Sequence, residues 1–151
     1  MGEDYAMRLN RDAQVNVVEG ALPHLAKGAR IVFVTSHQAH FIRTTPTMPE
    51  YEPVALSKRA GEDALRELVP NLAEKGISLV VVSGDMIEGT VTATLLDRSN
   101  PGAIEARRAE AGKLYSVVEF AGEVAKMVTA DVKSGHTEYV GGSDYFDKSS
   151  N

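Results

Sequence analysis

Several features that would define a class of function are absent from this sequence of 151 residues. It has no cysteine, which excludes disulfides, thiolate metal sites and a cysteine nucleophile and agrees with a reducing compartment. Its net charge of -5 offers no basic surface to nucleic acids or anionic membranes. No apolar run approaches the roughly 20 residues of a membrane helix, and the first residues do not resemble a signal peptide. We therefore expect a cytoplasmic protein that binds neither nucleic acid nor membranes.

The composition that remains is that of a globular domain. Hydrophobic residues make up 43% of the chain and charged residues 25%, a balance that allows a sizeable buried core. No internal repeat, low-complexity segment or linker divides the sequence. We predict one domain over residues 1–151.

Helical and strand patterns alternate along the first half of the chain. Apolar residues recur at helical spacing over 7–27, and Gly28 provides a stop just past the end. Two short apolar runs rich in β-branched residues, at 30–36 and 76–84, predict strands that are buried on both faces. Between them a polar loop leads to a helix that begins at Pro53 and that Pro70 should bend or end.

The second half continues the pattern after a loop that contains glycine and threonine. It predicts a charged, mostly helical stretch over 101–113, a helix over 117–129 and a short strand over 136–142, followed by a frayed polar tail. Strands joined by helical crossovers define an α/β domain with a parallel sheet. We expect three strands with flanking helices, which is part of a Rossmann-type doubly wound sheet.

Candidate site residues follow from this topology, because ligands of such sheets bind beyond the carboxyl ends of the strands. The first two strands end at Ser36 and at Ser83-Gly84, so these residues should face one crevice. Lys58 lies in the first turns of the helix that follows the first strand, on the same side of the sheet. A serine, a lysine and a glycine turn then share one opening.

The order of these segments resembles the short-chain dehydrogenase/reductase family. The matching pieces, which run from about residue 7 to residue 142, are Asn10 in a helix, Pro23, GARIVFVTS, SKRAGEDALREL, KGISLVVVSGDMIEGT and SGHTEYVGG. The resemblance implies hydride transfer between NAD or NADP and a small carbonyl or alcohol substrate. It also implies that the chain corresponds to the carboxyl-terminal half of such an enzyme.

The resemblance assigns a role to each matching residue. Asn10 stands where the family holds a water molecule, Ser36 where it binds the substrate carbonyl, and Lys58 where it lowers the pKa of a tyrosine and binds the cofactor ribose. The segment SGDMIEGT resembles the cofactor-binding turn of the family, with a serine in place of its proline. The cofactor-binding residues implied there are Ser83, Gly84, Met86 and Thr90.

One departure from the family concerns the proton donor. Val54 occupies the position of the family's tyrosine, four residues before Lys58, and valine has no proton to give. Tyr51 is the nearest replacement, and since Pro53 disfavours helical geometry at Glu52 we expect Tyr51 in the loop above the helix. Two interpretations stay open, a relocated acid and an ordinary loop aromatic that covers apolar surface. Water held near the serine and the asparagine is a further candidate donor.

A second departure concerns the cofactor. The sequence has no G-x-x-x-G-x-G turn before its first helix and no acidic residue to read the ribose after such a turn. We therefore expect either a homo-oligomer or dependence on a missing amino-terminal half that carries this turn. The alternative is a non-catalytic remnant of the family that acts as a binding or assembly module.

The remaining polar residues are weaker candidates. His37 and His40 lie three apart in a loop without an obvious third ligand, so we expect polar loop residues that line the substrate pocket and no metal. Asp85 and Glu88 are most simply solvated loop acids, and the charged run over 105–113 a solvated helix.

Overall fold

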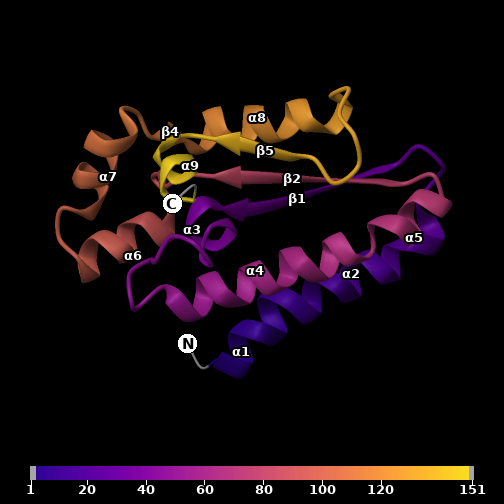
Figure 1. The fold of residues 1–151 in the computed structure, drawn as a ribbon, viewed down its shortest axis with the longest axis horizontal. Coiled ribbons are helices and arrows are strands. Elements are labelled where there is room, and N and C mark those ends of the chain that lie inside the picture. Colours follow the sequence, from indigo (N-terminus) through magenta and orange to yellow (C-terminus); the bar gives the residue numbers. More distant parts are fainter. Residues whose placement is uncertain (1–2, 150–151) are drawn as a thin grey trace.

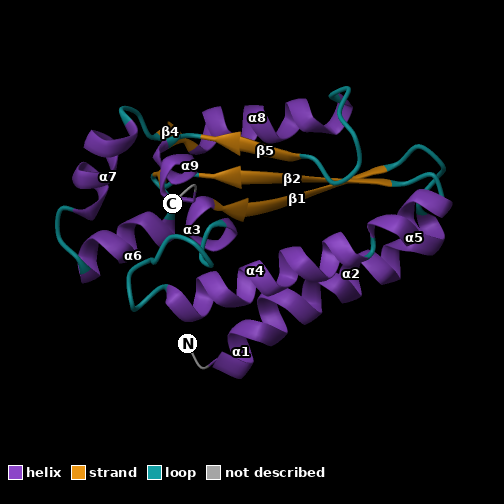
Figure 2. Ribbon diagram, in the orientation of Figure 1, coloured by secondary structure: helices purple, strands orange, loops and turns teal. Residues whose placement is uncertain are grey.

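The computed structural model describes residues 3–149 and shows three layers, with a parallel sheet between two layers of helices (Figure 1). The sheet has the order β1-β2-β5, and its strands are β1 (Arg30–Ser36), β2 (Ser78–Gly84) and β5 (Thr137–Val140). Figure 2 shows all three arrowheads directed toward the end of the sheet where α3, α6, α7 and α9 gather. The carboxyl ends of the strands therefore lie beneath a group of short helices.

Helices from the first half of the chain cover one face of the sheet (Figure 1). They are α1 (Glu3–Met7), the π-helical segment η1 (Arg8–Asp12), α2 (Ala13–Ala21), the 3-10 turn η2 (Leu22–His24), α4 (Glu52–Glu67) and α5 (Val69–Glu74). Pro70 lies in the first turn of α5, where its missing N–H and fixed φ are tolerated. The long helical stripe is therefore divided into α4 and α5 where the proline predicts a break.

The other face is covered by α8 (Val117–Thr129). Ser116 begins this helix with a reciprocal capping box, in which its hydroxyl accepts from Glu119 N and the Glu119 carboxylate accepts from Ser116 N. The remaining elements lie around the carboxyl ends of the strands. They are α3 (His37–His40), α6 (Val91–Ser99), α7 (Ala103–Ala111), α9 (Asp144–Ser149) and a two-stranded sheet of β3 (Ile87–Glu88) and β4 (Tyr115–Ser116).

The central strand β2 joins two apolar cores, because its alternate side chains point to opposite faces. Leu79 and Val81 pack with Phe33, Leu65 and Leu72 beneath α4 and α5. The residues that pack on the α8 face are Val80, Val82, Phe120, Met127 and Val140. Burial on both faces explains the uninterrupted apolar sequence of β2.

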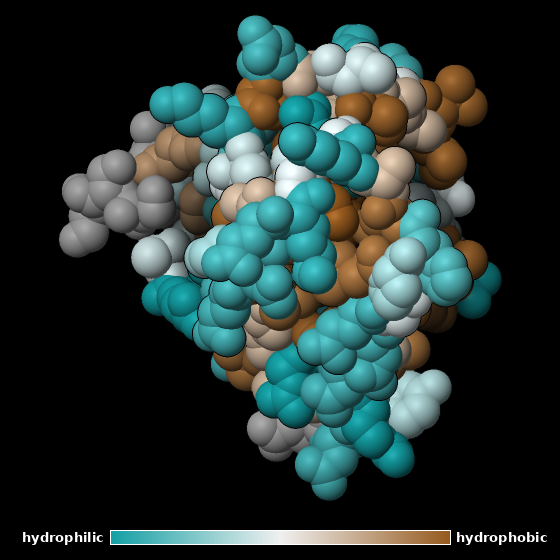
Figure 3. Space-filling model, turned by 90° about the vertical axis from the view of Figure 1, so that its right-hand side faces the viewer, coloured by the Kyte–Doolittle hydropathy of each residue, from teal (hydrophilic) through white to brown (hydrophobic). Residues whose placement is uncertain are grey.

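The outer side of β1 is open. Among the strands of residues 3–149, β1 pairs with β2 alone, and the side chain of Val34 is 42% exposed. Figure 3 shows apolar side chains gathered in the middle of one face of the molecule, between groups of hydrophilic side chains. An unpaired strand with apolar side chains is a surface on which another strand can add.

Most of the expected fold is confirmed. The α/β class, the parallel three-stranded sheet, the strand over Arg30–Ser36 and the helix over Val117–Thr129 are all present. The prediction of a frayed tail is wrong over Asp144–Ser149, which form α9 with a buried Tyr145, while residues 150–151 of that tail lie outside the described part. The loop predicted before residue 101 contains α6. No helix within residues 3–149 combines the length and hydrophobicity needed to cross a bilayer.

Candidate active site

A pocket lies at the carboxyl ends of β1 and β2, where Thr35 pairs with Ser83 and Ser36 with Gly84. Its polar lining consists of Thr35, Ser36, His37, Gln38, Tyr51, Lys58, Asp85, Thr90 and Thr92. Its other lining residues are Val34, Gly84, Met86, Ile87, Ala93, Leu96 and Phe120. The pocket encloses about 170 Å³, close to the roughly 150 Å³ of a cavity that holds one benzene molecule. It is a small pocket that is partly open to solvent.

Lys58 connects this pocket with a second, shallower one. The second pocket is lined by Asn10, Gln14, Val32, Phe33, Val34 and Lys58, beside the open side of β1. Two predicted catalytic residues, Asn10 and Lys58, therefore share one cavity, and Lys58 faces both.

The segment that carries Asn10 is irregular. Asn10 lies in the π-helical turn η1, a local widening that occurs often at functional sites. Its side-chain amide donates to Ser57 Oγ over 2.9 Å, and that hydroxyl donates to Val54 O over 2.9 Å. A Cβ on Gly61 would lie 2.0 Å from the Asn10 carbonyl oxygen, so only glycine allows η1 and α4 to approach this closely. The sequence held no signal for this contact beyond the glycine itself.

Tyr51 lies directly before α4 and lines the main pocket. Its side chain is 8% exposed and packs with Ala39, Ala55 and Leu96. The expected loop geometry is wrong at Glu52, because α4 begins at Glu52 and Tyr51 itself has helical angles (φ -98°, ψ -14°). Pro53 falls in the first turn, where a proline is compatible with a helix. Tyr51 is thus fixed by packing at the start of the helix that carries Lys58.

Ser36 ends β1 and begins α3. Its Oγ accepts a hydrogen bond from Ala39 N over 3.2 Å, as an N-cap residue does. Because the hydroxyl acts as an acceptor in this contact, its own hydrogen remains to be donated. Ser36 can therefore donate to an oxygen atom in the pocket.

The predicted cofactor-binding residues at the end of β2 and in the loop that follows it divide into two groups. Gly84, Met86 and Thr90 line the pocket, and Thr90 Oγ1 caps α6 by accepting from Ala93 N over 3.1 Å. Ser83 does not line it, since its side chain is fully buried and bonds to His37 Nδ1 over 2.8 Å.

Sequence reasoning missed an ion-pair cluster at the edge of the pocket. Arg107 of α7 donates to both carboxylate oxygens of Asp85, over 2.8 and 2.7 Å, and also pairs with Asp144 of α9. Asp85 further accepts from the backbone N–H groups of Met86 and Gly142. Burial alone would lower the pKa of Arg107, but its hydrogen bonds with the two aspartates raise it above the ordinary value.

These contacts and a neighbouring ion pair correct the expectations of solvated loop acids after β2 and of a solvated helix over 105–113. Asp85 is 9% exposed, so it is not a solvated loop acid, and Glu88 is held by an ion pair with Arg108. The run over 105–113 is not simply a solvated helix either, because the Arg107 side chain is only 10% exposed. A charged residue directly after a buried strand, as at Asp85, was the available signal.

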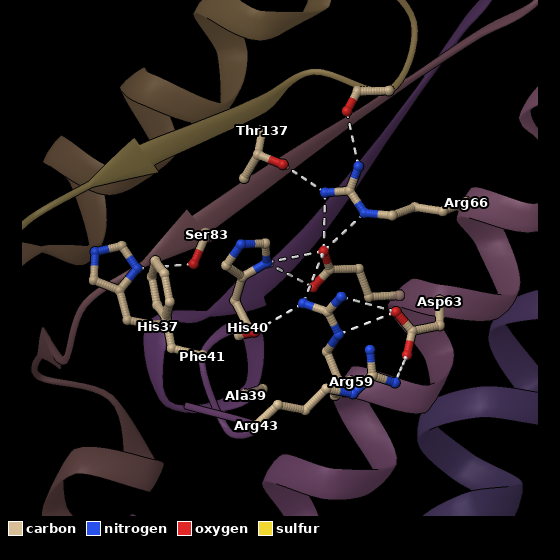
Figure 4. A network of polar contacts seen from close by, with 12 residues as sticks. His37, Ala39, His40, Phe41, Arg43, Arg59, Asp63, Arg66, Ser83 and Thr137 are labelled. Carbon is tan, nitrogen blue, oxygen red and sulfur yellow. Dashed lines mark hydrogen bonds and ion pairs between the residues drawn. The ribbon is translucent and has the colours of Figure 1, made fainter. Parts of the chain in front are cut away.

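The two histidines that the sequence predicts in a loop lie in helix α3 instead, and they have different partners. His37 lines the pocket with a side chain that is 1% exposed, and burial lowers its pKa to about 4. His40 Nδ1 lies 2.9 Å from a Glu62 oxygen (Figure 4). His40 Nε2 lies 3.0 Å from the Tyr139 hydroxyl. Within the described residues there is no group of three or more side chains that could hold a metal ion.

No known family profile and no curated protein sequence matches this chain. Solved structures do match its fold. They include a putative dehydrogenase from Burkholderia cenocepacia with bound NADP (TM-score 0.76, 17% identity, 93% of this chain and 53% of that one). BdcA in complex with NADPH matches with a TM-score of 0.73, 19% identity and coverage of 94% and 57%. A short chain dehydrogenase family protein from Francisella tularensis matches with a TM-score of 0.71, 20% identity and coverage of 88% and 57%.

These likenesses define the class of fold. The chain has a Rossmann-like α/β fold of the kind found in short-chain dehydrogenases. It spans about half the length of the solved chains it matches, since coverage of the three is 57%, 57% and 53%.

Proposed function

We propose that this chain forms the catalytic part of an NAD(P)-dependent oxidoreductase of the short-chain dehydrogenase/reductase kind. The observation that carries the proposal is the shared pocket of Ser36, Tyr51 and Lys58 at the carboxyl ends of two parallel strands. This is the part of such a sheet where ligands bind. The proposed substrate is a small carbonyl or alcohol compound, as the resemblance to this family implies.

The cofactor, when bound, supplies the hydride, and the residues of this chain orient the substrate and move the proton. Ser36 donates to the carbonyl oxygen, and Tyr51 gives the proton to the same oxygen. Lys58 lines the same pocket as Tyr51 and binds the cofactor ribose. Asn10 anchors a water molecule that links Lys58 to solvent.

The residues proposed to hold the nicotinamide end of NAD or NADP are Lys58, Gly84, Met86 and Thr90, all of which line the pocket. Ser83, fully buried, supports their loop from behind through His37. The rest of the cofactor needs a glycine-rich turn, and we propose that a further segment carrying one adds a strand to the open side of β1. A second copy of this chain is the other candidate for that surface.

Cofactor binding tests this assignment without turnover. Saturation-transfer NMR with NADPH should show stronger transfer to nicotinamide protons than to adenine protons, and the dissociation constant should be millimolar or weaker. Lys58→Met should abolish the nicotinamide signal, whereas Lys75→Met, an exposed lysine after α5, should leave it unchanged. Equal transfer to both rings, or no difference between the two variants, would exclude the proposed site.

The proton donor is tested by turnover in a preparation that contains the glycine-rich segment. Tyr51→Phe removes only the hydroxyl and should lower the rate about 10²–10⁴-fold with cofactor binding intact. If Tyr51 only covers apolar surface, this change will be nearly silent. Val54→Tyr, which places a tyrosine four residues before Lys58, would then raise the rate.

A non-catalytic assembly module is the second candidate, and Val54 at the position of the family's tyrosine favours it. In that case β1 recruits a partner strand and no hydride transfer occurs. Amide exchange identifies the partner in either case, because protection of Val32 and Val34 that rises with chain concentration indicates pairing between copies, and turnover separates the two candidates. Measurable NADPH oxidation dependent on Tyr51 would exclude this candidate.

A further inference from the structure

Ser57 precedes Lys58 in α4, and its buried hydroxyl joins two polar groups in a fixed direction. The hydroxyl lies 2.9 Å from the Val54 carbonyl oxygen, which can only accept, so its single hydrogen is used there. Toward Asn10, Ser57 Oγ can therefore only accept a hydrogen bond, and this contact is also 2.9 Å long. The Asn10 amide must turn its NH2 group, and not its oxygen, toward Ser57.

The oxygen of the same amide is left open. Asn10 Oδ1 makes no hydrogen bond within residues 3–149, yet it is not one of the buried side-chain atoms that lack a partner. Because Asn10 is only half-buried, solvent reaches this oxygen. Asn10 lines the second pocket, beside β1. An accessible acceptor with two lone pairs therefore belongs to a residue in the wall of that pocket.

Lys58 has the complementary need, a donor without an acceptor. Its ammonium has no hydrogen bond and no ion pair in the part of the chain that the structure describes, and Lys58 lines the same second pocket. Asn10 packs on this part of α4, since a Cβ on Gly61 would lie 2.0 Å from the Asn10 backbone oxygen. Gly61 is three residues after Lys58 and four after Ser57, so it neighbours both on the helix surface. The open oxygen and the open ammonium thus belong to residues that lie side by side.

We propose that Ser57 is a positioning residue, which holds the Asn10 amide so that its oxygen accepts a hydrogen bond from the Lys58 ammonium. This inference rests on the proposed function, in which Lys58 binds the cofactor ribose. A lysine that is held in place before the ligand arrives loses less conformational freedom on binding. The second lone pair of Asn10 Oδ1 remains for the water molecule that links Lys58 to solvent. Without the Ser57 hydroxyl the amide can turn, and its NH2 group then faces the ammonium as donor against donor.

NMR of the full chain without cofactor tests the hydrogen bond itself. The ¹³Cγ signal of the Asn10 side chain responds to hydrogen bonds at its oxygen, so Lys58→Met should shift it and Lys75→Met should not. Ser57→Ala should shift the same signal and speed the exchange of the Asn10 NH2 protons with water. Ser57→Thr keeps a hydroxyl that can bond to the carbonyl of the preceding turn, and should restore the wild-type signals.

Cofactor binding then tests whether this hydrogen bond serves the site. Ser57→Ala should weaken binding of the nicotinamide end of NADPH about two- to tenfold, the contribution of one typical hydrogen bond, and Ser57→Thr should not.

An Asn10 ¹³Cγ signal that is the same in wild type and Lys58→Met overturns the inference, and Gln14, the other amide of the pocket, would then be the partner of the ammonium. A signal unchanged by Ser57→Ala, or wild-type NADPH binding by Ser57→Ala, overturns it as well. Lys58→Met alters an accessible side chain, so it decides the question even if Ser57→Ala is unstable. Should Lys58→Met leave NADPH binding unchanged, the proposed function fails, while the ¹³Cγ shifts still decide how the amide is held.

Discussion

His37 and His40 are three residues apart and have opposite surroundings. Both ring nitrogens of His40 have partners, Glu62 at Nδ1 and Tyr139 at Nε2. The fully buried Glu62 also pairs with Arg59 and Arg66 (Figure 4). Within residues 3–149, His37 has one partner and one unpartnered buried nitrogen. A buried polar group with all its partners serves the fold. A buried polar group that lacks one leaves part of its desolvation cost uncompensated.

The largest expected effect is on the free energy of unfolding, and it concerns Glu62 in the network around His40. Burial raises the pKa of Glu62, but hydrogen bonds from His40 and Arg66 outweigh it and hold the pKa below its ordinary value. Glu62→Ala leaves the Arg59 and Arg66 guanidinium groups without their shared buried anion, and breaking such a buried pair typically costs about 3–5 kcal/mol. Urea unfolding should show this loss, whereas Glu67→Ala, exposed on the same helix, should change stability by less than about 0.5 kcal/mol. Similar values for both would mean that the network adds nothing.

A smaller effect, on the pH dependence of stability, concerns His37. Its pKa falls from 6.5 in the unfolded chain to about 4 in the fold, because burial disfavours the charged ring. The unfolded state therefore binds more protons, so stability is full above about pH 6.5 and falls by up to about 3 kcal/mol as the pH approaches 4. Unfolding free energies across this range should show a steeper acid slope for the wild type than for His37→Asn. Parallel slopes would place the ring in contact with water.

The smallest effect concerns α4, the helix that carries Glu62. Gly61→Ala places a methyl group against the Asn10 carbonyl oxygen, and overpacking of this kind typically costs about 1–3 kcal/mol. Gly122→Ala, at an open position within α8, should instead stabilise by about 0.5–1 kcal/mol. Thermal unfolding of the two variants should therefore change in opposite directions. A shared direction would show that η1 can move away from α4.

The parts of the fold that the sequence predicts are those governed by local pattern. The apolar runs of β1 and β2, the capping serine of α8 and the break at Pro70 each depend on neighbouring residues. The tail was misjudged because α9 is stabilised by contacts with distant residues. Its Tyr145 is covered by Arg107, 4.9 Å from the ring centre. Such contacts leave no periodic signal in a short polar segment.

The candidate site was likewise predictable where local pattern decides and unpredictable where distant contacts decide. Strand ends located Ser36 and Gly84, the helix start located Lys58, and the resemblance to the family suggested Tyr51. All four residues line one pocket. The pattern could not show that Ser83 faces the core, because neighbouring residues of one strand end can face a pocket or a core. Asp85 was judged solvated since its partner, Arg107, lies 22 residues further along the chain.

The Arg107 cluster has a consequence for handling the protein. It ties the helix α7, the loop after β2 and the terminal helix α9 to a single guanidinium. Removing α9, or fusing a bulky tag close to it, would therefore loosen Asp85 and with it the loop that lines the pocket. A purification tag at the carboxyl terminus is thus expected to weaken ligand binding, whereas a tag at the opposite terminus leaves this cluster intact.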